Sequence, residues 1–124
     1  MNLMIPKINF RMNIYNFDSK LNDVDYNIEI LKDSSVIDKL FFIVGHSGMG
    51  DNCYFNDIKK LEIGDYVYLD VDHEVLIYKI IDRYYIVKNG YMNLGFDKYN
   101  RLYLITCDIS DGNRQLVLKG ILIN

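Results

Sequence analysis

The 124-residue sequence has no tryptophan, one proline and two cysteines. Two cysteines allow at most one disulfide, which excludes a disulfide-rich secreted scaffold. The sequence has no run approaching the roughly 20 apolar residues of a membrane-spanning helix, and no basic-then-apolar signal peptide. Its formal net charge of −3 also removes the electrostatic case for a nucleic-acid-binding protein, because such binding depends on basic surface.

Motifs for phosphate and metal binding are missing as well. The glycines of residues 45–50 are not followed by the Lys-Ser/Thr ending of a phosphate-binding loop. There is no paired-cysteine or histidine cluster with zinc-ligand spacing. Four aspartates, at positions 23, 25, 70 and 72, could hold Ca²⁺, but their spacing does not require it. We therefore predict solvated carboxylates, no metal site and no cofactor.

What remains is the composition of a globular β protein. Half of the residues are hydrophobic and eleven are tyrosine, a residue that favours strands. Short apolar segments alternate with turns rich in Gly, Asn and Asp, and residues 66–71 alternate with the period of two that a half-covered strand requires. We predict an all-β fold in a single domain over residues 1–124, with short helical structure over residues 54–61 and two final strands over 101–106 and 114–123.

Three residues with complementary chemistry lie where predicted strands end. Cys107 follows one strand, Arg114 opens the next and His46 follows a buried strand. A thiolate is a nucleophile, an imidazole can carry its proton and a guanidinium can hold an oxyanion. The alternatives are a buried structural cysteine, a loop histidine and a surface arginine paired with Asp108 or Asp111.

The remaining histidine and cysteine are assigned no chemistry. His73 lies in a polar hairpin turn between Asp72 and Glu74. Cys53 lies in a different loop from Cys107, and we expect it to be a small, partly buried residue without a disulfide.

These segments resemble the sortases, the cysteine transpeptidases of Gram-positive cell surfaces. The family pattern Thr-Leu-x-Thr-Cys is matched by Tyr103-Leu104-Ile105-Thr106-Cys107, and its histidine context by Gly45-His46-Ser47. Arg114 precedes apolar residues as the family's arginine does. Residues 4–8 look like the opening strand of the family. The departures are Tyr103, where threonine is usual, and residues 11–27, which follow no strong pattern.

The resemblance implies a closed eight-stranded barrel with one or two short helices. It also implies that Cys107 is the nucleophile, His46 the acid/base and Arg114 the oxyanion holder, with Thr106 and Leu104 at the substrate groove. The segment 89–100 is too short for the long helix of class B enzymes. We therefore expect a compact catalytic domain of the class A, D or E kind.

The function implied is cleavage of a Leu-Pro-x-Thr-Gly-like sorting signal through a thioester, followed by transfer to an amine of peptidoglycan or of a pilin. The partners would be that signal peptide and that amine. The site of action would be the extracellular face of the cell membrane, reached through an anchor that we expect to be missing from this chain. The alternative is a non-catalytic sortase-like barrel that binds peptides. The tyrosine at position 103, where the family has threonine, is the reason for retaining this alternative. An unrelated all-β interaction module is a more distant third.

Overall fold

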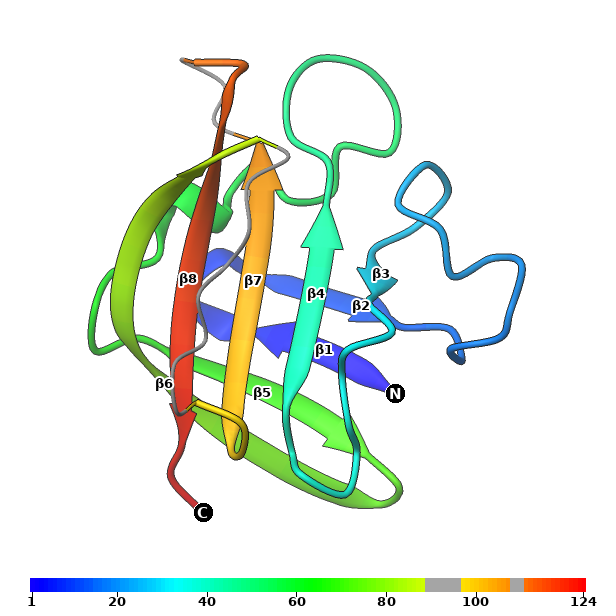
Figure 1. Ribbon diagram of the computed structural model, residues 1–124, viewed down its shortest axis with the longest axis vertical. Coiled ribbons are helices and arrows are strands. Elements are labelled where there is room, and N and C mark those ends of the chain that lie inside the picture. Colours follow the sequence, from blue (N-terminus) through cyan, green and yellow to red (C-terminus); the bar gives the residue numbers. More distant parts are fainter. Residues whose placement is uncertain (89–96, 108–110) are drawn as a thin grey trace.

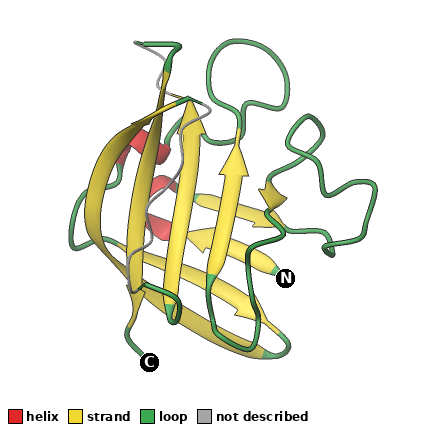
Figure 2. Cartoon of the chain, in the orientation of Figure 1, coloured by secondary structure: helices red, strands yellow, loops and turns green. Residues whose placement is uncertain are grey.

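The computed structural model describes residues 1–88, 97–107 and 111–124. As predicted, the fold is all-β, and its described helical structure is limited to two 3-10 turns, η1 (Pro6–Ile8) and η2 (Ile58–Lys60) (Figure 2). The helix expected over residues 54–61 is therefore only the short turn η2. Among the described residues, no helix is long and apolar enough to span a membrane. The strands are β1 (Asn2–Ile5), β2 (Phe10–Asn13), β3 (Glu29–Ile30), β4 (Phe41–Gly45), β5 (Tyr66–Val71), β6 (Glu74–Val87), β7 (Arg101–Cys107) and β8 (Arg114–Leu122).

All eight strands belong to one sheet, in the order β2-β1-β5-β6-β8-β7-β4-β3. Neighbouring strands are antiparallel except β4 and β7, which run in parallel. Figure 1 shows the arrowheads of β4 and β7 side by side at the same end of the sheet. Two strand ends that are far apart in the sequence therefore open onto the same group of loops.

The expected closure of the barrel is not confirmed. In the described residues the two outermost strands, β2 and β3, form no ladder with each other, so the sheet is curled but open. The gap is bridged by the buried side chain of Asn27, whose Nδ2 donates to the carbonyl oxygen of Asn13 at 2.8 Å. A strand as short as β3 offers little backbone for a further ladder.

The sheet carries an apolar cluster on each of its faces. The inner cluster fills the curl and includes Leu3, Ile5, Ile43, Phe55, Val67, Leu69, Tyr78, Ile80, Leu102, Leu104 and Leu118. The smaller outer-face cluster covers the opposite side of β4, β7 and β8 with Leu40, Phe42, Tyr103, Ile105 and Val117. Because side chains alternate along a strand, residues 102, 104 and 106 of β7 face inward, and residues 103, 105 and 107 face the outer side.

At position 45, the last residue of β4, only glycine fits, because the Phe55 side chain leaves no room for a Cβ atom. An ideal Cβ at position 45 would lie 2.5 Å from Cγ of Phe55. The Phe55 ring is fully buried and packs edge-to-face on Phe10, with 5.8 Å between ring centroids. The ring lies directly against the Gly45 backbone, immediately before His46.

Gly45→Ala should therefore destabilise the protein by roughly 1–3 kcal/mol, the usual cost of overpacking a core. Equilibrium urea unfolding measures the change. Gly112→Ala is the matched control, because a Cβ there meets nothing within 4 Å, and its effect should stay below about 1 kcal/mol. Equal stability of the two variants would show that Phe55 moves aside without cost.

Candidate active site

The parallel ladder between β4 and β7 ends at the pair Gly45 and Thr106, and His46 and Cys107 come directly after these two residues. Gly45 is the register partner of Thr106, so the next residue of each strand lies at the same end of the sheet. The hydroxyl Oγ of Ser47 donates to the carbonyl oxygen of Cys107 at 2.6 Å. The strand ends carrying the candidate acid/base and nucleophile are therefore connected directly.

The loop after His46 folds back on itself. The backbone N–H of Phe55 donates to the carbonyl oxygen of His46 at 2.9 Å, and the N–H of Gly48 donates to Oδ1 of Asn56 at 2.7 Å. Gly48 and Gly50 have φ angles of +130° and +113°, which glycine adopts without strain. The glycines thus serve a tight loop that fixes the backbone next to His46.

Arg114 begins β8, beside the residue that pairs with Cys107. Gln115 is the register partner of Cys107. The Arg114 guanidinium carbon lies 4.1 Å from the centroid of the Tyr85 ring, and its Nε lies 3.6 Å from Oδ2 of Asp111. The pairing with Asp111 is the alternative that the sequence left open. The stacking on Tyr85 adds an orienting contact that sequence reasoning missed.

Tyr103, the departure from the family pattern, lies in the outer-face cluster. It is 1% exposed and stacks on Phe42 with 4.9 Å between ring centroids. Its hydroxyl lies 3.5 Å from Oδ2 of Asp97, which also receives a hydrogen bond from Lys119. The bond from Lys119 holds the pKa of Asp97 below its ordinary value, and burial raises the pKa of Tyr103. The tyrosine is therefore accommodated as a structural residue that connects β7 to Asp97.

Leu104 and Thr106 face the other side of β7. Leu104 is fully buried in the inner cluster, and Thr106 is 2% exposed. The Thr106 hydroxyl has no hydrogen-bond partner in the described part of the chain. Both side chains pack in the interior rather than beside Cys107, and their part in substrate binding stays a prediction.

Metal ligands do not gather at this end of the sheet or elsewhere among residues 1–88, 97–107 and 111–124, where no three His, Cys, Asp or Glu side chains could share a metal. Cys53 and Cys107 are both free.

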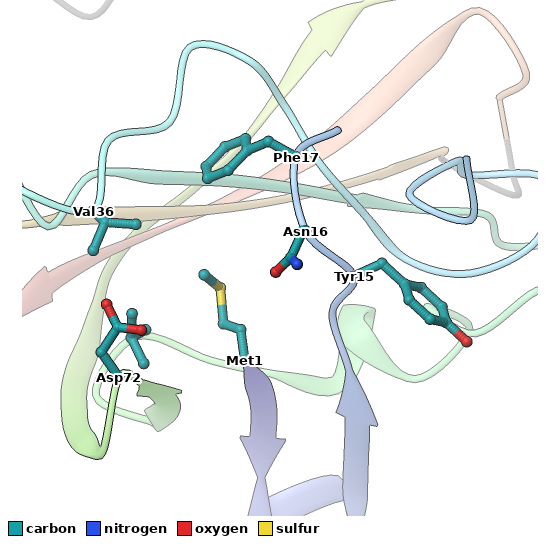
Figure 3. A pocket seen from close by; sticks show the side chains of 7 residues that line it. Met1, Tyr15, Asn16, Phe17, Val36 and Asp72 are labelled. Carbon is teal, nitrogen blue, oxygen red and sulfur yellow. The ribbon is translucent and has the colours of Figure 1, made fainter. Parts of the chain in front are cut away.

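A pocket of about 200 Å³ lies away from the candidate residues. It is surrounded by Met1, which precedes β1, by Asp72 of the β5–β6 turn and by the segment after β2 (Figure 3). Its full lining is Met1, Tyr15, Asn16, Phe17, Val36, Val71 and Asp72. Because it contains neither His46, Cys107 nor Arg114, it is not the site of the predicted chemistry.

Comparison with known proteins gives one family. The sequence model of the sortase domain matches residues 3–122. No match is found among curated proteins.

Three solved structures illustrate the similarity of fold. Sortase C1 from Streptococcus suis is 21% identical with a TM-score of 0.84, over 99% of this chain and 72% of that one. A lid mutant of sortase A from Corynebacterium diphtheriae is 19% identical with a TM-score of 0.81, over 99% and 69%. Clostridium perfringens sortase C with the C-terminal cell wall sorting motif is 21% identical with a TM-score of 0.79, over 99% and 69%. The chain spans about two thirds of the solved sortase chains it matches.

Proposed function

Because the chain belongs to the sortase family, whose members are cysteine transpeptidases, we propose that it cleaves a sorting signal and transfers the new carboxyl group to an amine. The observation that carries the proposal is the parallel pairing of β4 with β7, which brings His46 and Cys107 to one end of the sheet. Arg114 opens the neighbouring strand at that end.

The chemistry follows from the three side chains. The Cys107 thiolate attacks the carbonyl carbon of the scissile peptide bond, and the carbonyl oxygen takes up the negative charge beside Arg114. The C–N bond then breaks, and the leaving amine takes a proton from the protonated His46. An acceptor amine attacks the resulting thioester and gives its proton to His46. The C–S bond breaks, and the thiolate is restored.

The substrate proposed is a Leu-Pro-x-Thr-Gly-like signal, cut between Thr and Gly. A bound sorting motif in the Clostridium perfringens relative supports this class of substrate. Peptidoglycan or a pilin would supply the amine. Sortases act at the surface of Gram-positive bacteria, and we place this chain's reaction there.

Incubation with a quenched Leu-Pro-x-Thr-Gly peptide library and hydroxylamine tests the proposal. Hydroxylamine is a small amine-like nucleophile, so a thioester intermediate should yield a peptide hydroxamate that mass spectrometry detects. Cys107→Ala should give none. Peptide binding without any hydroxamate from the wild type would instead identify a non-catalytic peptide-binding domain.

A further inference from the structure

The His46 ring is held by a carboxylate from a distant segment. Its Nε2 lies 2.8 Å from Oδ1 of Asp25, a residue of the segment between β2 and β3. The His46 side chain is 40% exposed and the Asp25 side chain 74%. Such an exposed pair adds little to the stability of the fold, about 1 kcal/mol at most. Its main effect is therefore on the His46 imidazole ring, whose orientation it restrains.

Asp25 is fixed in position from two sides. On its own segment, the Asp25 N–H donates to Oδ1 of Asp23 at 2.9 Å. From the loop that follows His46, Asn52 Nδ2 donates to the Asp25 carbonyl oxygen at 2.8 Å. Asn52 is held in turn by the Tyr54 hydroxyl, which donates to its Oδ1 at 2.9 Å. The carboxylate is therefore supported by the same loop that carries the histidine.

The contact determines which ring nitrogen is available for chemistry. A carboxylate accepts hydrogen bonds, so Nε2 carries the hydrogen that it donates to Asp25. In the neutral ring, Nδ1 is then left as the nitrogen with a free lone pair.

We propose that Asp25 is a positioning residue for His46: it fixes the ring orientation and the tautomer in which Nδ1 exchanges protons with the thiol and the amines. This inference rests on the proposed function, because it gives His46 the role of the acid/base. Asp25 itself acts only through the imidazole ring, and not on the nucleophile or the scissile bond.

Removal of the carboxylate should affect the reaction rate and spare substrate binding. Asp25→Ala should lower kcat about three- to tenfold, the scale expected from a partly exposed charge-assisted contact, with KM unchanged. Asp18→Ala is the matched control. Asp18 is an exposed aspartate of the same segment, and its side chain makes no hydrogen bond or ion pair in the described structure. In a His46→Ala background, Asp25→Ala should cause no further loss.

NMR of the imidazole nitrogens tests the positioning without relying on turnover. At alkaline pH the wild-type His46 ring should show the Nε2–H tautomer, and Asp25→Ala should convert it to a mixture. His73, which lies in the β5–β6 turn, provides an internal reference that should not change. Asp25→Asn brings an amide N–H donor as well as an acceptor oxygen, so it should not hold the ring in the single Nε2–H tautomer.

The outcomes separate the two proposals. A wild-type protein without transpeptidation contradicts the proposed function, whereas the ring nitrogens still show whether Asp25 fixes the tautomer. Identical His46 nitrogen signals in wild type and Asp25→Ala, or an equal loss of kcat in Asp18→Ala, would overturn the positioning role while leaving the proposed function intact.

Discussion

Cys107→Ala is expected to reduce transpeptidation by at least about 10³-fold, to the level of the uncatalysed background, while the fold stays intact. The thiolate forms the covalent intermediate, so its removal takes away the nucleophile itself. Loss of one sulfur atom at the partly exposed end of β7 leaves the carbonyl oxygen of residue 107 free to accept the hydrogen bond from the Ser47 hydroxyl as before. Hydroxamate yield measures turnover, and the thermal unfolding midpoint measures the fold.

Cys53→Ala is the matched control for this substitution. Cys53 is the protein's other free cysteine, and its Sγ is 3.9 Å from the carbonyl oxygen of Met49. Its loss should leave turnover near the wild-type value. Wild-type activity in Cys107→Ala would end the proposal of a thioester intermediate, and so would loss of activity in the Cys53 variant alone.

Arg114→Ala is expected to lower kcat/KM at least about 10²-fold, the scale of a lost oxyanion donor. The guanidinium is oriented by the Tyr85 ring at 4.1 Å and by Asp111 at 3.6 Å. Lysine offers no planar fork to stack on the ring, so Arg114→Lys should lose nearly as much as Arg114→Ala. Steady-state kinetics with a fluorogenic sorting peptide measures both variants.

Arg11→Ala, which removes an exposed arginine from β2, controls for the loss of one positive charge and should keep its activity. Full activity in Arg114→Lys would mean that positive charge alone is sufficient. The proposal that the Tyr85 ring orients the guanidinium for catalysis would then be wrong.

Strands with a regular pattern could be predicted from the sequence, and irregular ones could not. Residues 66–71 alternate strictly, and β5 has those bounds. The strand β6 runs from Glu74 to Val87, but its register shifts between Ile80 and Asp82, and the extra residue breaks the period of two that marks a strand in the sequence. The opening strand expected over residues 4–8 ends at Ile5, because Pro6 begins the turn η1 and Asn9 after it adopts a left-handed φ of 53°.

The sequence could indicate those candidate site residues whose position follows from the end of a strand. The motif around Cys107 and the buried strand before His46 are local patterns, and parallel pairing then brings them together. Asp25 could not be identified as the partner of His46, because residues 17–27 have no hydrophobic period and the contact depends on tertiary folding. The same is true of Tyr85 beneath Arg114, which lies in β6 as one tyrosine among eleven.

The parallel pairing of β4 with β7 also has a consequence for the order of folding. The Ser47–Cys107 contact joins residues 60 positions apart in the chain, whereas the β5–β6 hairpin turns within Asp72 and His73. Closing a long loop costs chain entropy before its contacts form, and such parallel pairing is intrinsically slow. A newly made chain can therefore build its hairpins early, but it acquires the His46–Cys107 arrangement only in the late, non-local step that completes the sheet.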